Sequence, residues 1–280
     1  MQNIAGRNIY SYQKRDLLYM LLKKILKAAG LTGIPKAMAD ELTSARGNLD
    51  KTFPSDFSPA EAQHINFVKE KTMTSPERLV TLARAIDHLE SGKIEGDIVE
   101  CGVWKGGSMM LVARKLMEYN NTARRLFLFD TFEGMSEPGS ADVSAVDLSK
   151  AEDLLKKEDR LNGDNVWCYS PVDEVKANLS QTGYPLSSIH FIKGKVEETL
   201  PHPEIGKIAL LRLDTDWYES TKHELETLYD LLVPGGILII DDYGHWSGAR
   251  KAVDEFFAER EIRIFLNRID YTGRIAIKPN

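Results

Sequence analysis

The sequence is poor in several features that would point to particular classes of protein. It holds only 2 cysteines among 280 residues, Cys101 and Cys168, too few for a disulfide framework or a cysteine-based zinc site. No apolar run approaches the roughly 20 residues that a membrane-spanning helix needs. The N-terminus also lacks the apolar core and small-residue cleavage site of a signal peptide. We therefore expect a cytoplasmic protein whose thiols are reduced and buried.

Positive charge is not in surplus either. The formal net charge is -6 and the pI about 5.6, which argues against a nucleic-acid partner. There is no internal repeat and no low-complexity tract. What is present, 42% hydrophobic and 28% charged residues, is typical of a soluble globular protein with one large domain or two small ones.

The first 60 residues differ in pattern from the rest. Residues 14–30, "KRDLLYMLLKKILKAAG", predict an amphipathic basic helix that ends at Gly30. Its apolar face favours packing on its own subunit or on a partner subunit, so we expect a homodimer or a higher oligomer; contact with a membrane surface is the alternative. Residues 31–57 are interrupted by glycine and proline and predict a connecting or lid-like segment. We therefore divide the chain into an N-terminal helical extension, 1–60, and a main domain, 61–280.

The main domain alternates between strands and helices. Two helix starts come first: "SPAE" at 58–61, with Ser58 and Glu61 as a capping box, and "SPER" at 75–78, with Ser75 as the cap. Strands are then predicted at 96–103, 125–130, 188–194, 207–216 and 235–243, and helices at 75–92, 106–119, 149–160, 170–181, 218–232 and 246–260. Two short strands around "IRIFLN" and "GRIAIKP" close the chain. This alternation predicts an α/β fold with a doubly wound, mainly parallel sheet, whose ligands bind beyond the carboxyl ends of the strands.

Acidic residues gather at these strand ends. In "LLRLDTDW" Asp214 and Asp216 stand two positions apart, and they project to one side if strand geometry persists. Asp241 and Asp242 end the neighbouring strand. Such crowded carboxylates repel one another unless a cation or a proton lies between them. Since oxygen donors suit Mg²⁺, we predict a magnesium site, with helix caps and surface turns as the alternative.

The turn after the first strand is rich in glycine. In "VECGVWKGGS", residues 99–108, Gly102 and Gly106 allow a close approach to a ligand, and Ser108 lies at a helix N-terminus. The spacing is not that of a dinucleotide site, because Trp104 stands where a second glycine would admit a pyrophosphate. The turn therefore predicts a nucleoside-like ligand without a diphosphate, and Glu100 suits one with a positive centre; a tight turn without a ligand is the alternative.

The next strand ends in Asp130, within "FDTFEGM". An acid at this place can accept hydrogen bonds from both hydroxyls of a ribose. The alternative is that it caps the following segment.

Five stretches together resemble the macrocin O-methyltransferase family: "TMTSPERL", "ECGVWKGGS", "FDTFEGM", "RLDTDWYEST" and "GGILIIDDYGHW". They stand in order across residues 65–260. The resemblance implies a Rossmann-like class I methyltransferase fold and transfer of a methyl group from S-adenosylmethionine to a sugar hydroxyl, with Mg²⁺. The acceptor is then a small sugar-bearing molecule, such as a glycosylated natural product.

The resemblance also implies roles for residues that match its motifs. Asp214, Asp241 and Asp242 are similar to the family's metal ligands, and Asp216 to its general base. Met73, Thr74 and Ser75 resemble the stretch that closes over the methionine end of the cofactor, Glu100 and Gly102 the floor beneath it, and Asp130 the ribose acceptor. The full set of residues predicted to bind the cofactor is Met73, Thr74, Ser75, Glu100, Gly102, Gly106, Ser108, Asp130, Gly194, Lys195 and Asp214.

Two other functions are compatible with these motifs. A catechol-type O-methyltransferase would use the same cofactor and a similar acidic metal site on a planar diol. The acid pair at 241–242 argues against it, because an aspartate–asparagine pair would be expected there. A non-catalytic cofactor-binding protein is the other alternative, and the acids present at every predicted metal position argue against that.

Overall fold

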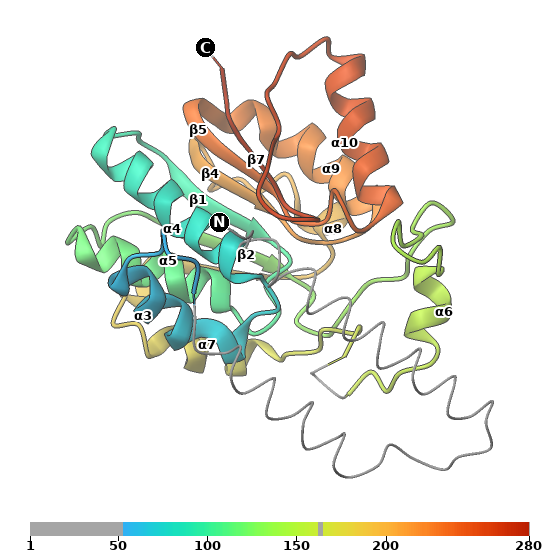
Figure 1. The fold of residues 1–280 in the computed structure, drawn as a ribbon, viewed down its shortest axis with the longest axis horizontal. Coiled ribbons are helices and arrows are strands. Elements are labelled where there is room, and N and C mark those ends of the chain that lie inside the picture. The colour runs from blue at the N-terminus through green and yellow to red at the C-terminus, as the bar shows by residue number, and fades with distance from the viewer. Residues whose placement is uncertain (1–52, 162–164, 280) are drawn as a thin grey trace. The chain divides into compact units, whose positions relative to one another are not determined.

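The computed structural model describes residues 53–161 and 165–279. A seven-stranded sheet runs through the molecule in the order β3-β2-β1-β4-β5-β7-β6 (Figure 1). Its strands are β1 (Asp97–Cys101), β2 (Leu126–Asp130), β3 (Ile189–Lys193), β4 (Ile208–Leu213), β5 (Leu232–Ile240), β6 (Asn267–Arg268) and β7 (Arg274–Ile277). The first five are parallel, and β7 pairs antiparallel with both β5 and β6. The predicted doubly wound, mainly parallel sheet is confirmed.

Helices cover both faces of this sheet. They are α3 (Pro59–Val68), α4 (Pro76–Ser91), α5 (Gly107–Glu118), α6 (Ala151–Leu155), α7 (Val172–Ser180), α8 (Val196–Thr199), α9 (Tyr218–Leu228) and α10 (Ser247–Glu259). Helix α4 packs against α5 on one side, and α9 packs against α10 on the other (Figure 1). Every residue of β1 and β4 is buried between these layers, as expected for central parallel strands.

The register of β1 and β4 sets up the site. Glu100 lies opposite Arg212 in the parallel ladder, and both side chains are buried within otherwise apolar strands. Such a charged pair is costly to bury unless each member is bonded. The centre of the sheet therefore carries a polar network directly beneath the carboxyl ends of its strands.

The predicted helix starts are confirmed. The amide of Ser58 donates to Glu61 Oε2 at 2.7 Å, and that of Glu61 donates to Ser58 Oγ at 3.2 Å, which is a reciprocal capping box. Ser75 Oγ accepts from the amide of Arg78 and begins α4, which ends before Gly92.

Other elements are shorter than the sequence indicates. The helix predicted over 149–160 is confined to α6, because residues 156–160 are charged and offer no apolar face to bury. The strand expected at "IRIFLN" shrinks to β6, since Ile262, Ile264 and Leu266 pack onto the core instead of joining a ladder. Helix α8 was not anticipated.

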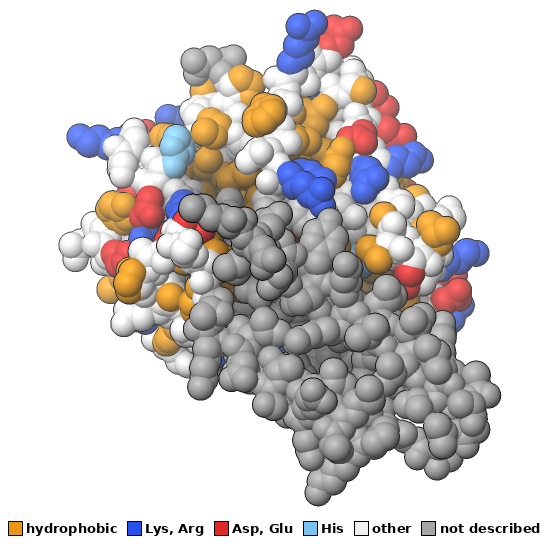
Figure 2. All heavy atoms as spheres, in the orientation of Figure 1, with side chains coloured by type: hydrophobic (Ala, Val, Ile, Leu, Met, Phe, Trp, Pro, Cys, Tyr) orange, Lys and Arg blue, Asp and Glu red, His pale blue; other side chains and the backbone are white. Residues whose placement is uncertain are grey.

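Residues Gln63–Asn280 form the compact unit that carries the site. The predicted helix at 14–30, the lid-like segment before residue 53 and the apolar face expected to form an oligomer lie outside the described residues, and they stay predictions. Among the described helices, none has the length and apolar character to cross a membrane. On the face in Figure 2, described acidic and basic side chains are interspersed with apolar ones.

Candidate active site

A cavity of about 340 Å³ opens beyond the carboxyl ends of β1, β2, β4 and β5. This is the place where an open α/β sheet binds its ligands. The cavity is lined by most of the residues predicted to bind a cofactor: Met73, Thr74, Gly102, Ser108, Asp130, Gly194, Lys195 and Asp214. The predicted cofactor residues therefore gather around one cavity, and their role there stays a prediction.

Three predicted cofactor residues do not line the cavity. Ser75 caps α4 and donates to Asp270 Oδ2 at 2.7 Å. Gly106 is the left-handed N-cap of α5, where a β-carbon would come 3.0 Å from Val175. Glu100 faces the buried Arg212 instead. These three residues lie outside the lining of the cavity, and their contacts with a cofactor stay predictions.

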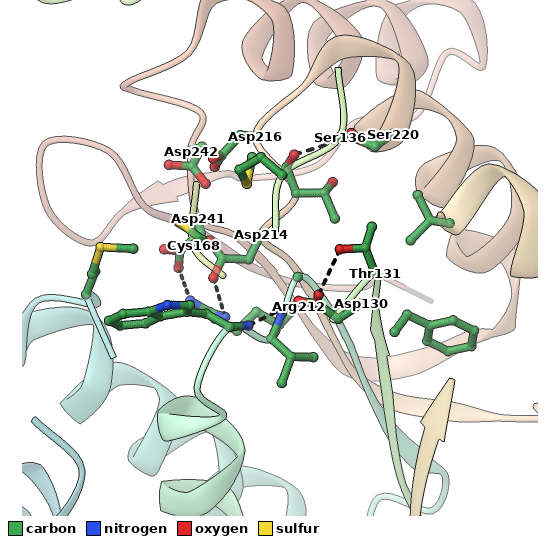
Figure 3. A pocket seen from close by; sticks show the side chains of 18 of the residues that line it. Asp130, Thr131, Ser136, Cys168, Arg212, Asp214, Asp216, Ser220, Asp241 and Asp242 are labelled. Atoms are coloured by element: carbon green, nitrogen blue, oxygen red, sulfur yellow. Dashed lines mark hydrogen bonds and ion pairs between the residues drawn. The ribbon is translucent and has the colours of Figure 1, made fainter. Parts of the chain in front are cut away.

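Three carboxylates converge at one end of the cavity. Asp214, Asp216 and Asp242 each offer one carboxylate oxygen, and these three oxygens all lie within 4.8 Å of one another (Figure 3). The expected strand geometry does not persist, because β4 ends at Leu213 and Asp216 has a φ of 70° in the left-handed region. The turn after β4, and not strand alternation, brings Asp214 and Asp216 together.

Asp241 is paired with two guanidinium groups. Arg78 Nη1 donates to its Oδ2, and Arg212 Nη2 lies 2.9 Å from its Oδ1 without the alignment of a hydrogen bond. Burial acts to raise the pKa of Asp241, but Arg212 and Arg78 outweigh burial and hold that pKa below its usual value. Of the predicted metal triad, the structure therefore groups Asp214 and Asp242 with Asp216, and pairs Asp241 with arginines.

The sequence reasoning missed these two arginines. Arg212 Nη1 lies 2.7 Å from Asp214 Oδ2 (Figure 3). The same nitrogen lies 2.7 Å from Glu100 Oε1, and Arg212 Nη2 donates to Thr74 Oγ1 at 3.1 Å. Burial still raises the pKa of Glu100 to about 7, because Arg212 offsets it only in part. A guanidinium in the middle of the apolar run "LLRLD" was the signal available, since a buried arginine requires acidic partners.

The donor set fits a divalent cation. Burial raises the pKa values of Asp214 and Asp242 well above the usual range. Asp242 Oδ2 is buried and has no hydrogen-bond partner among the described residues. Arg78 and Arg212 pair with four carboxyl groups, those of Asp241, Asp270, Glu100 and Asp214, and Asp216 and Asp242 add two more at the same end of the cavity. An excess of hard oxygen donors with too little positive charge is the environment that Mg²⁺ occupies.

Asp216 differs from its neighbours. No described basic side chain pairs with it. Burial raises its pKa to about 7, and the charges of Asp214 and Asp241 add to that rise. A carboxyl group with a pKa near neutrality can accept a proton at physiological pH and release it again.

Asp130 braces the glycine-rich turn. Its Oδ2 accepts from the amides of Val103 and Trp104 at 2.7 and 3.1 Å, and its Oδ1 accepts from the amide of Phe132 at 2.6 Å. The capping alternative thus has direct geometric support, while the side chain also lines the cavity. Gly102 is required beside it, because its φ is 84° and a β-carbon would lie 2.0 Å from the carbonyl oxygen of Asp214.

Comparison with known proteins connects this geometry to an activity. The family model described as Macrocin-O-methyltransferase (TylF) matches residues 59–276. The 8-demethyl-8-(2,3-dimethoxy-alpha-L-rhamnosyl)-tetracenomycin-C 4'-O-methyltransferase of Streptomyces olivaceus is 38% identical over 202 residues, which cover 72% of this chain and 73% of that protein. Demethyldecarbamoylnovobiocin O-methyltransferase of Streptomyces niveus is 31% identical over 205 residues, with the same two coverages.

A solved structure, that of the O-methyltransferase NovP, superposes with a TM-score of 0.65 at 28% identity. The match covers 75% of this chain and 83% of that one, so the sheet and helices described above form a class I methyltransferase fold. The chain belongs to the macrocin O-methyltransferase family and is an S-adenosylmethionine-dependent O-methyltransferase.

Proposed function

We propose that this enzyme methylates a hydroxyl group on the sugar of a glycosylated natural product, with the help of Mg²⁺. The observation that carries the proposal is the convergence of Asp214, Asp216 and Asp242 at the cavity that holds the predicted cofactor residues. The names of the two relatives supply the acceptor class, because both act on natural products and one acts on a rhamnosyl group.

The residues divide the work as follows. Asp214 and Asp242, which belong both to the predicted triad and to the observed cluster, would hold the cation, and Asp241 pairs with Arg78 and Arg212. When bound, the cation supplies positive charge that lowers the pKa of an aliphatic hydroxyl. An oxygen of Asp216 takes the proton of that hydroxyl. The cavity walls align the hydroxyl with the sulfonium methyl, which supplies much of the rate.

Metal dependence is the direct test. Purified protein is incubated with S-adenosylmethionine and the rhamnosylated tetracenomycin named by the relative, and S-adenosylhomocysteine is measured with and without a chelator. We expect turnover to vanish in the chelator and to return when Mg²⁺ is added back. Undiminished turnover in the chelator would rule out the metal.

A simple catechol, offered in place of the glycoside, serves as the control for the catechol-type alternative. We expect it to be left unmethylated under conditions in which the glycoside turns over. Cytoplasmic localisation and a homodimer or higher homo-oligomer stay predictions from the sequence.

A further inference from the structure

An imidazole borders the acidic end of the cavity and has no part in the chemistry above. His245 follows the acid pair in "DDYGHW" and lines the same cavity as Asp214, Asp216 and Asp242. Tyr271, from the turn between β6 and β7, also lines it. Its Oη lies 3.3 Å from His245 Nδ1, which joins two segments that are far apart in the sequence.

The backbone around the pair is built for this contact. A β-carbon on Gly244 would come 2.0 Å from the carbonyl oxygen of Tyr271, so only glycine lets the two loops approach so closely. The amide of Gly244 donates to the carbonyl of Thr272 at 2.9 Å, and Thr272 Oγ1 donates to the carbonyl of Asp241 at 2.8 Å. The tyrosine turn is therefore fastened to the loop that carries the acid pair.

The imidazole ring is also fixed on its other side. The ring of Trp246 meets it edge to face, with centroids 4.8 Å apart and an interplanar angle of 88°. The carbonyl of His245 accepts from the amide of Ala145 at 2.7 Å. With its ring packed and its backbone tied, His245 has little freedom to change orientation.

The contact with Tyr271 fits two proton arrangements, because a phenol oxygen can donate to Nδ1 or accept from an Nδ1–H. The arrangement in which Tyr271 donates is the one that the proposal below uses, since His245 Nδ1 is the acceptor that the described residues offer to Tyr271 Oη. When Nδ1 accepts, the N–H of the ring is on Nε2. Within the described part of the chain Nε2 has no hydrogen-bond partner, so in this arrangement a fixed donor is left at the border of the cavity.

We propose that His245 and Tyr271 form a specificity pair: Tyr271 fixes the imidazole, and the Nε2–H donates to a sugar oxygen beside the hydroxyl that is methylated. The inference rests on the proposed function and names a feature of its substrate. An N–H donor on the enzyme can bond to a sugar hydroxyl or to an ether oxygen, whereas an acceptor on the enzyme could bond only to a sugar hydroxyl, which has a proton to donate. The enzyme then accepts sugars whose neighbouring oxygen already carries a methyl group, and disfavours sugars that lack an oxygen there.

Matched variants test the pair by steady-state kinetics on the rhamnosylated tetracenomycin. His245→Leu removes the donor, and we expect the acceptor KM to rise about tenfold, the change that one lost hydrogen bond produces. His245→Gln places an amide N–H near the position of Nε2 and should stay within about threefold of wild type. His88→Leu is the control, since His88 bonds the carbonyl of Gly235 and does not line the cavity. The dissociation constant of S-adenosylmethionine should be unchanged in all three.

The tautomer of His245 can be measured by NMR spectroscopy without an activity assay. Long-range ¹H–¹⁵N spectra of histidine-labelled protein should show His245 protonated at Nε2, and Tyr271→Phe should move it toward a mixture. An Nδ1–H tautomer in the wild type would overturn the pair, as would equal losses in the Leu and Gln variants together with weaker cofactor binding. A wild type that binds S-adenosylmethionine but leaves the glycoside unmethylated would instead contradict the proposed function.

Discussion

At the scale of single residues, two carboxylates two positions apart have different surroundings. Asp214 Oδ2 lies 2.7 Å from Arg212 Nη1, so a positive charge is already beside it. Asp216 stands in the left-handed region with a φ of 70° and a pKa of about 7. Unusual backbone conformations of this kind are often found at functional sites. These surroundings favour Asp214 as a ligand of the cation and Asp216 as the group that accepts the proton.

The division of labour predicts different behaviour for the two asparagine variants. Asp214→Asn should weaken Mg²⁺ binding, and extra metal should restore part of the lost activity. Asp216→Asn should lower kcat by about 10²–10⁴-fold, as loss of a general base does, with little change in cofactor affinity. A higher pH should recover some of that rate, since solvent base can then take the proton. Equal weakening of Mg²⁺ affinity in both variants would show that both are ligands.

Asp241 gives a second residue-scale prediction. Asp241 pairs with both Arg78 and Arg212, so Asp241→Asn removes one charged partner from each guanidinium group, while Asp270 stays with Arg78 and Glu100 and Asp214 stay with Arg212. We expect a loss of about 1.5–3 kcal/mol in the free energy of unfolding, the range for a lost hydrogen bond to a charged group. Denaturant unfolding in a chelator measures this without the metal. A variant as stable as wild type in the chelator, but weaker in Mg²⁺ binding, would make Asp241 a ligand and not an anchor.

At the scale of elements, the close contact between the β1 and β4 loops holds the acids in position. Gly102 and Gly183 offer a matched comparison, because their φ values are 84° and 78°. At Gly183 a β-carbon would meet nothing within 4 Å, whereas at Gly102 it would collide with the Asp214 carbonyl. Gly183→Ala should cost only the backbone strain, about 1–2 kcal/mol. Gly102→Ala should cost more and abolish activity, as unfolding curves and turnover would show. Similar losses for the two variants would mean that the loops separate freely.

The elements also show what the sequence could and could not predict. Periodicity and caps identified the strands and helices, and the strand-end rule located the cavity, because these depend on neighbours along the chain. The pairing of Asp241 with Arg78 depends on α4 and β5, whose contact no local pattern reveals. Similarly, the left-handed turn at Asp216 could not be inferred from strand alternation. Tertiary partners of charged groups were therefore the part that sequence reasoning missed.

At the scale of the whole molecule, the carboxyl groups of the site make the free energy of unfolding depend on pH. Burial raises the pKa values of Glu100 and Asp216 to about 7, from 4.5 and 3.8. Between about pH 4.5 and pH 7 the folded protein therefore binds more protons than the unfolded chain. Stability is then greatest at the lower end of this window and falls as the pH rises through 7.

In a chelator, we expect the melting temperature to fall by several degrees between pH 5 and pH 8, since a domain of this size loses about 2–4 °C per kcal/mol. Mg²⁺ should make the melting temperature fall less between pH 5 and pH 8, because a bound cation stabilises the ionised carboxylates. Asp216→Asn is the informative variant: an amide cannot ionise, so the slope should be smaller, by up to about 1.4 kcal/mol per pH unit for one proton. Calorimetry across the pH series measures both slopes. A melting temperature that rises toward pH 8 without metal would mean that these carboxyl groups are already ionised in the folded protein, and that the site does not need a cation to balance its charge.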